Sequence, residues 1–214
     1  MKRNLLALVL VVLTFTSCAN LYYDAMEKMG KPKRDIMVDR VEAARDTQND
    51  AKEQFLTTLE QFKEVVNFDG GNLEKEYNKL NTTLDRTEAE AGKVHKRILA
   101  IEDVSQALFQ EWEEEISLYS SDALRRASKK KLDTTQLKYT ELISAMLRAE
   151  ARLEPALVPL RDQVLFMKHN LNASAIAGLS SELISVETNV DRLVAELESA
   201  IEQADEFIMA LQEQ

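Results

Sequence analysis

The fold is decided by residues Leu73–Tyr119, which read LEKEYNKLNTTLDRTEAEAGKVHKRILAIEDVSQALFQEWEEEISLY. Apolar and small residues recur here at alternating spacings of three and four for roughly six heptads, which places one apolar stripe along a single helix. A helix of about 47 residues is about 70 Å long and cannot bury that stripe on itself. The stripe comprises Leu73, Tyr77, Leu80, Leu84, Thr87, Ala91, Val94, Ile98, Ile101, Ser105, Leu108, Trp112, either Glu115 or Ile116, and Tyr119.

Three further segments repeat this period and supply the partners that the stripe needs. They are Arg34–Val66, Asp122–His169 and Ile176–Leu211. The pair Gly70 and Gly71 separates the first two helices, and such a short connection makes consecutive helices antiparallel neighbours. The sequence therefore predicts an all-α protein, an elongated antiparallel four-helix bundle or coiled coil that forms a single domain over residues 33–214.

The end of the long helix has two possible positions. Ser121 offers an N-cap, and a break there leaves a third helix, Asp122–His169, whose length suits the bundle. A rival break at Asp133 has capping-box spacing and would place Lys129–Lys131 at the negative end of the preceding helix. We favour the break near Ser121. Asn170 is expected to end the third helix in a left-handed conformation.

Residues 1–17 have the features of a lipoprotein-type signal peptide. Lys2 and Arg3 precede an apolar run that is too short to span a membrane, and the run ends in Phe15-Thr16-Ser17-Cys18. This stretch resembles a lipobox, which implies cleavage before a lipidated Cys18, although Phe15 departs from the usual aliphatic residue. The other interpretation is an ordinary cleaved signal with an incidental cysteine.

A lipidated Cys18 would carry two or three acyl chains, more than the single chain that anchors only marginally. Ala19 follows Cys18, and resemblance to enterobacterial lipoproteins then implies transfer to the inner leaflet of the outer membrane, facing the periplasm. Residues 18–32 would form an N-terminal tether. Tyr22 and Tyr23 in this tether suit either the membrane interface or the start of the bundle.

The overall charge argues against a nucleic-acid partner. The net charge is −10, and removal of Lys2 and Arg3 lowers the 27 basic residues to 25 against 37 acidic ones, which gives −12. Binding to nucleic acid depends mainly on neutralising phosphates, so such a surface should repel it. The single cysteine also leaves no intrachain disulfide.

The sequence contains no constellation that would indicate an enzyme, a metal site or a cofactor. Di-iron bundles need Glu three residues before His, whereas Gly92 and Phe166 precede His95 and His169. Phosphate-binding loops, dinucleotide fingerprints and nucleophile elbows are absent from the sequence. We therefore expect a non-enzymatic protein without a bound metal or cofactor.

One strongly basic cluster remains as a candidate contact site. It comprises Arg125, Arg126, Lys129, Lys130 and Lys131. These side chains could contact phosphate head groups or an acidic partner. They could equally offset the surrounding acids. Around Trp112 lies an acidic cluster of Glu111, Glu113, Glu114 and Glu115, which we expect to be solvated.

Several stretches resemble the bacterial family known as domain of unknown function 2959. They are Ala25–Lys28, Lys33–Val41, Phe68–Gly71, Leu108–Glu113 and Lys168–Ala173. The resemblance covers essentially the whole mature chain and implies a Gram-negative envelope protein, commonly with a lipoprotein-type signal. It implies no catalytic residues.

Two functional hypotheses follow from the sequence. The first is a lipid-anchored periplasmic structural or adaptor protein, which binds an envelope protein partner through a helical surface. The alternative is a carrier that holds a lipid or another apolar ligand within the bundle. A homo-oligomer, formed along an exposed helical edge, is compatible with either.

Overall fold

The computed structural model describes residues 22–23, 25–68, 70–170 and 173–213, without the side chains of 173–175 and 177. It contains four long helices: α2 (Lys33–Val66), α3 (Leu73–Leu118), α4 (Asp122–His169) and α5 (Ala173–Gln212). The described part of the chain has no β-strand, which confirms the predicted all-α class. Within it, no helix is both long enough and apolar enough to cross a membrane.

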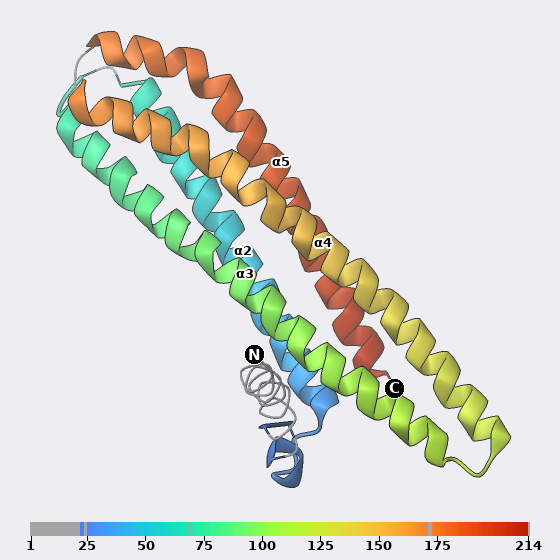
Figure 1. The fold of residues 1–214 in the computed structure, drawn as a ribbon. Helices are drawn as coiled ribbons and strands as arrows, with labels where there is room; N and C mark the ends of the chain where they lie inside the picture. The colour runs from blue at the N-terminus through green and yellow to red at the C-terminus, as the bar shows by residue number, and fades with distance from the viewer. Residues whose placement is uncertain (1–21, 24, 69, 171–172, 214) are drawn as a thin grey trace, which may run out of the picture.

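The four helices lie side by side as one elongated bundle (Figure 1). Packing runs around the bundle from α2 to α3, α4 and α5, and α5 closes the ring against α2. Ion pairs mark the antiparallel register of α2 and α5: Lys63 contacts Glu187 at 2.7 Å, and Arg45 contacts Asp205 at 2.9 Å. The predicted antiparallel four-helix bundle is therefore confirmed.

The core lies where the apolar stripes of the four helices meet. Leu80, Ile98 and Ile101 on α3 are almost completely buried, as the heptad pattern predicts. Each buried Leu or Ile contributes roughly 1.5–3 kcal/mol relative to leaving it exposed. The largest fully buried side chains of the other helices are Met37, Phe55, Phe62, Leu132, Leu142, Met146, Leu160, Met167 and Phe207.

Side-chain caps fix the starts of two helices. Asn72 accepts a hydrogen bond from the Lys75 backbone N–H at 3.1 Å, and the hydroxyl of Ser121 accepts one from the Leu124 N–H at 3.4 Å. Gly70 and Gly71 before the first cap have φ of 152° and 112°, which side chains rarely adopt. The break near Ser121 is confirmed, and the rival at Asp133 is wrong because this residue lies inside α4.

The end of α4 differs from the sequence expectation. Asn170 has φ of −136°, so the predicted left-handed cap is wrong. Its side-chain amide instead donates to the Phe166 carbonyl at 2.9 Å, and its backbone N–H donates to the Met167 carbonyl at 3.0 Å. Asn170 therefore pairs with two of the last carbonyl groups of α4, which a left-handed cap would otherwise satisfy, and it does so with a negative φ.

Two polar features lie within the core. The hydroxyls of Thr58 and Thr87 join α2 to α3 through a buried hydrogen bond of 2.6 Å. Gln48, on the stripe of α2, is also buried, and neither atom of its side-chain amide has a hydrogen-bond partner. An unpaired buried amide destabilises the folded state. Among the described residues, Gln48 is the only one with buried side-chain polar atoms that lack a hydrogen bond, and no neighbouring group accounts for its place in the core.

A short helical segment, residues 22–23 and 25–28, precedes α2. Gly30, with φ of 85°, ends it in a Schellman arrangement: its N–H donates to the Glu27 carbonyl at 2.8 Å, and the Lys31 N–H donates to the Met26 carbonyl at 3.0 Å. This turn sends the chain back into α2 and lays the segment beside α3.

Tyr22 and Tyr23 have different environments. Tyr23 is 2% exposed, and its hydroxyl donates a hydrogen bond to the Asp103 carboxylate on α3. Tyr22 is exposed and packs its ring edge-on against Tyr23. The structure therefore assigns Tyr23 to the bundle, as one of the two sequence interpretations has it.

Candidate functional site

The end of the bundle where the chain enters α2 carries an unusual projection. The first residue of α2, Lys33, pairs with Glu111, and near the end of α5 the ring of Phe207 lies 6.5 Å from that of Tyr139. Residues 113–133 of α3, α4 and their turn therefore extend past the ends of α2 and α5 (Figure 1). We call these residues the hairpin tip, and this end of the bundle its base.

Lys33 joins the three elements that meet at the base. Only 6% of the residue is exposed, and its Nζ lies 3.2 Å from Glu27 Oε2 and 3.0 Å from Glu111 Oε1. Burial acts to lower the pKa of Lys33, but the hydrogen bonds to Glu111 and Glu27 outweigh it and leave the pKa raised. Burial raises the pKa of Glu111, and Lys33 opposes this only in part.

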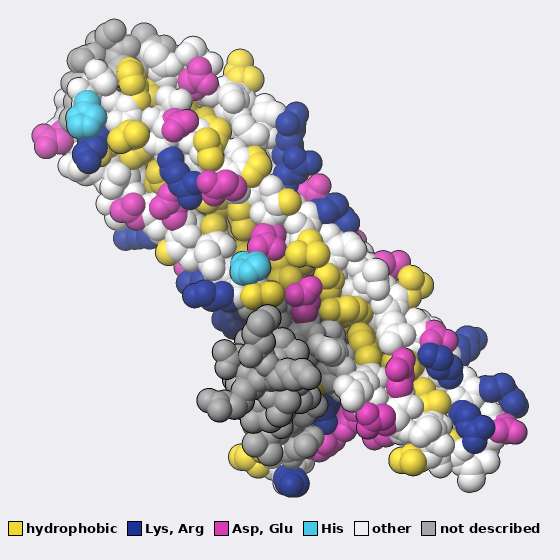
Figure 2. All heavy atoms as spheres, in the orientation of Figure 1, with side chains coloured by type: hydrophobic (Ala, Val, Ile, Leu, Met, Phe, Trp, Pro, Cys, Tyr) yellow, Lys and Arg dark blue, Asp and Glu magenta, His cyan; other side chains and the backbone are white. Residues whose placement is uncertain are grey.

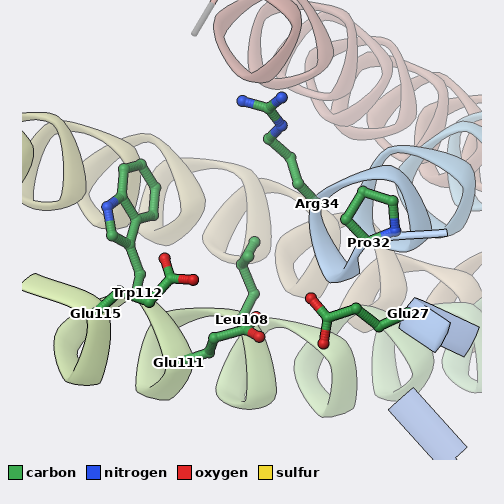
Figure 3. A pocket seen from close by; sticks show the side chains of 7 residues that line it. All are labelled: Glu27, Pro32, Arg34, Leu108, Glu111, Trp112 and Glu115. Atoms are coloured by element: carbon green, nitrogen blue, oxygen red, sulfur yellow. The ribbon is translucent and has the colours of Figure 1, made fainter. Parts of the chain in front are cut away.

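A small hollow of about 130 Å³ lies at this bridge itself, and two larger ones open near it. The first, of about 230 Å³, is lined by Glu27, Pro32, Arg34, Leu108, Glu111, Trp112 and Glu115. Figure 3 shows Leu108, Glu111, Trp112 and Glu115 on α3. Glu27 reaches toward them from the short segment, while the Arg34 side chain extends away from α3 at the start of α2. The second, of about 350 Å³, is lined by Arg34, Trp112, Tyr119, Leu124, Ala127, Ser128 and Lys131.

Arg34 and Trp112 belong to both hollows, so the two form one continuous surface at the base. The indole Nε1 of Trp112 donates a hydrogen bond of 3.0 Å to Ser128 Oγ. This bond joins α3 to α4 on the tip side of the first residue of α2. The first hollow carries three carboxylates and one cation, whereas the second carries Arg34 and Lys131 over an aromatic and apolar floor. The second hollow therefore suits an anionic amphiphilic group, and the first does not.

The five predicted basic contact residues all lie on the first three turns of α4, and the structure brings them together on the hairpin tip. Arg125 donates to the Asp122 carboxylate at 3.0 Å and to the Tyr119 carbonyl, and Lys129 pairs with Asp133 at 2.9 Å. Within the described chain, the side chains of the other three have no hydrogen-bond or ion-pair partner: Arg126, Lys130 and Lys131. These three cations are available for an external ligand.

Large apolar side chains accompany the free cations. Leu118 is 81% exposed and Leu124 57% exposed, and Tyr119 lies between them in the turn. Figure 2 shows Lys and Arg side chains gathered over this end of the molecule, with hydrophobic side chains among them. The tip thus combines positive charge with an exposed apolar turn.

The other polar candidates from the sequence remain isolated. His95 is exposed on α3, and its Nδ1 lies 2.7 Å from Glu150 Oε1 on α4. His169 is exposed at the end of α4, and Glu113, Glu114 and Glu115 are exposed on α3. Among the described residues, no group of three His, Cys, Asp or Glu could hold a metal ion.

Sequence reasoning missed several residues of the base. Nothing in the spacing of Lys33 indicates a partner 78 residues away at Glu111. The expectation that Glu111 is solvated with its acidic neighbours is wrong, because it is half-buried against Lys33. Tyr23 and Asp103 are 80 residues apart, and no sequence pattern indicates their contact either. Cys18, the predicted lipidation site, lies outside the described residues.

Comparison with protein families returns one match. Residues 22–211 match the family model described as "Protein of unknown function (DUF2959)". A search of curated proteins returns no match. The matched range includes the short segment, all of α2, α3 and α4, and nearly all of α5. Because this range is most of the chain, the protein belongs to the DUF2959 family of proteins of unknown function.

Proposed function

We propose that this protein is a non-enzymatic, lipid-anchored envelope protein of the periplasm, held by Cys18 in the inner leaflet of the outer membrane. Its role is that of a structural or adaptor module that binds a protein partner through a helical surface. The observation that carries the proposal is the placement of the tether. The short segment that follows Cys18 folds against α3 at the base, while the helices extend away from it (Figure 1).

The dimensions of the bundle suit an adaptor. α3 has 46 residues, which corresponds to about 69 Å at 1.5 Å per residue. A rod of this length, attached at one end, presents helical faces well away from the membrane surface. The ring of four helices buries one stripe of each helix and leaves the outer faces free for a partner.

The outer face of α4 favours a helical partner. Leu137, Val158 and Leu165 are exposed and share one heptad phase, with exposed Ser144 and Ala151 in the same row. A row of small and apolar residues every seven positions is the spacing that one helix presents to another. This row points away from the core, whose α4 contacts come from other positions.

In-cell photo-crosslinking tests the adaptor role. A photoreactive residue at Val158 should yield adducts with one specific envelope protein. The same residue at Glu202, exposed on α5, serves as the matched control. Equal and diffuse labelling from both positions would overturn the proposed partner surface.

The anchor has a separate test. The substitution Cys18→Ser should release the protein from isolated membranes and abolish the increase in mass due to acyl chains. A variant that remains in the membrane fraction without a change in mass would contradict lipidation at Cys18.

The carrier hypothesis is the second candidate, and it draws on Gln48. Its unpaired amide, buried within the bundle, is the kind of group that a ligand between the helices would satisfy. The hollows described above open on the surface, however, and large side chains such as Phe55 and Phe207 fill the core. Native mass spectrometry of the purified protein distinguishes the carrier from the adaptor hypothesis. A carrier should show an additional mass that corresponds to a bound lipid.

A further inference from the structure

We propose that the hairpin tip is a contact site for anionic phospholipid headgroups, so that the protein meets its membrane at two points. This inference rests on the proposed lipid anchor and adds the orientation of the bundle to it. The tip residues concerned are the apolar turn, Leu118, Tyr119 and Leu124, and the cations Arg126, Lys130 and Lys131.

Chain topology places the tip at the anchored end. In an up-and-down bundle, the start of α2 and the turn between α3 and α4 lie at the same end, and Figure 1 shows both at the base. The tip also projects beyond the start of α2, because Lys33 contacts Glu111 and not the residues after it. The tip is therefore the part of the described bundle that extends furthest at the anchored end.

The length of the tether then limits the distance between tip and membrane. Cys18 and Tyr23 are five residues apart, a span of at most about 18 Å. Tyr23 is held at Asp103, and the 15 residues from Asp103 to Leu118 correspond to about 22 Å along α3. The chain from Cys18 to Tyr23 is thus shorter than the part of α3 that extends from Asp103 to Leu118. If the bundle stands upright on the membrane, its tip must enter the headgroup layer. If the bundle is tilted, the tip lies on that layer.

The side chains of the tip match that environment. Leu118 is the most exposed large apolar residue of α3, and it sits beside Tyr119 and Leu124 on the outside of the turn. Apolar and aromatic side chains of this kind insert at the boundary between headgroups and acyl chains. The turn can enter the boundary without unfolding, since these side chains are already outside the core.

The free cations supply complementary charge. Arg126, Lys130 and Lys131 lack partners among the described residues, in a chain whose net charge is −10. An anionic leaflet attracts such side chains within about a Debye length of its surface. The α4 side of the tip has five cations and two acidic residues, Asp122 and Asp133, which pair with Arg125 and Lys129, whereas the α3 side has Glu113, Glu114 and Glu115. The α4 side is therefore the face that meets lipid.

Two charges at the turn between α3 and α4 are unfavourable for the stability of their own helices. Arg125 lies in the first turn of α4 and Glu115 in the last turn of α3, where the helix dipoles favour the opposite charges. A cationic first turn weakens the isolated helix, although Asp122 offsets Arg125 in part. An anionic surface facing this turn would restore favourable electrostatics.

A fluorophore placed on the tip tests the contact. Cys18 is the only cysteine, and acylation blocks its thiol, so Ser120→Cys gives the lipidated protein one reactive site in the turn. An environment-sensitive dye at this site should shift to shorter wavelength in phosphatidylglycerol-containing vesicles relative to phosphatidylcholine vesicles. The same dye on Lys75→Cys, exposed at the far end of α3, should not shift.

Charge reversal supplies the matched comparison. The triple variant Arg126→Glu, Lys130→Glu and Lys131→Glu should abolish the shift at position 120 while helical content stays unchanged. The control triple variant carries the same change in charge on exposed residues elsewhere, at Arg86, Lys96 and Arg152, and should retain the shift. Equal spectra from the two dye positions, or a shift that survives reversal on the tip, would overturn the proposal.

The remaining outcomes separate the tip from the anchor. If the parent protein itself reacts with the dye, the Cys18 thiol is free, and the proposed anchor fails. Added anionic vesicles then test the tip independently, on the Cys18→Ser protein labelled at position 120. A spectral shift that appears without vesicles and grows with protein concentration would instead indicate a second copy on the tip, which overturns the lipid contact.

Discussion

The ammonium of Lys33 and the carboxylate of Glu111 lie 3.0 Å apart at the base of the bundle, although 78 residues separate them in the chain. Together with Glu27 they join the short helical segment, α2 and α3. The hydroxyl of Tyr23 adds a second link to α3 through Asp103. These contacts decide where the tether lies against α3, and under the proposed lipid anchor they also decide how the tip faces the membrane.

The base should open at alkaline pH. The pKa of Lys33 is raised above its ordinary value of 10.5, and burial with the Asp103 hydrogen bond raises the pKa of Tyr23 above its ordinary 10.0. Groups with a raised folded pKa stabilise the folded state below the unfolded pKa, and this contribution is lost as pH rises through the folded value. Limited proteolysis within residues 25–31 by an alkaline-active subtilisin, which does not need a charged side chain at the cleavage site, should therefore accelerate only above about pH 10. Unchanged cleavage up to pH 12 would contradict the role of this pair.

Glu111→Gln should loosen the same junction at neutral pH. The substitution removes the charge that faces Lys33 but keeps the size of the side chain, and a hydrogen bond to a charged group is worth about 1.5–3 kcal/mol. Chemical denaturation should show a loss near the lower figure, since Glu27 still pairs with Lys33. Glu114→Gln, on an exposed neighbour, is the control and should change stability little.

Ile98→Ala should destabilise the bundle by about 2–5 kcal/mol, because it deletes a buried side chain and leaves a cavity. Ile98 is 1% exposed, whereas the next residue, Leu99, is 49% exposed. Leu99→Ala should therefore stay within about 0.5 kcal/mol of the parent protein. Urea unfolding of both variants checks the pair, and similar losses would show that the assigned inner face of α3 is wrong.

Gln48→Met should stabilise the protein. It replaces an unpaired buried amide by an apolar side chain of similar shape and removes a desolvation penalty of about 1–3 kcal/mol. The melting temperature of the purified protein should rise. Gln54→Met is a useful comparison, since the Gln54 amide donates to the Thr83 carbonyl at 3.4 Å. A fall in melting temperature for Gln48→Met would show that the amide has a bound partner, as the carrier hypothesis requires.

Much of the bundle was predictable because its determinants are local. Apolar spacing identified the stripe of α3 and its inward residues Leu80, Ile98 and Leu108. Capping chemistry placed the start of α4 at Ser121. Such patterns depend on residues within one or two helical turns, which a sequence displays directly.

Periodicity failed where burial and polarity conflict. Gln48 lies on the apolar stripe, but spacing alone does not show that its amide has no partner in the core. Lys33, a cation at the start of α2, is buried between two carboxylates, and the period of the helix does not show this. Trp112 was assigned to the core stripe, and it is half-buried because α2 begins only at its level.

The amino-acid pattern alone therefore decided the number, length and inner faces of the helices, and it marked the five basic residues as a candidate site. Only the packed bundle decided that Lys33 is buried between Glu27 and Glu111, and that α3 and α4 extend beyond α2 and α5 at the base. The pairs of Arg125 with Asp122 and of Lys129 with Asp133 are local, at spacings of three and four within α4. The contact of Lys33 with Glu111 joins residues 78 positions apart, and it exists only because whole helices are aligned against one another.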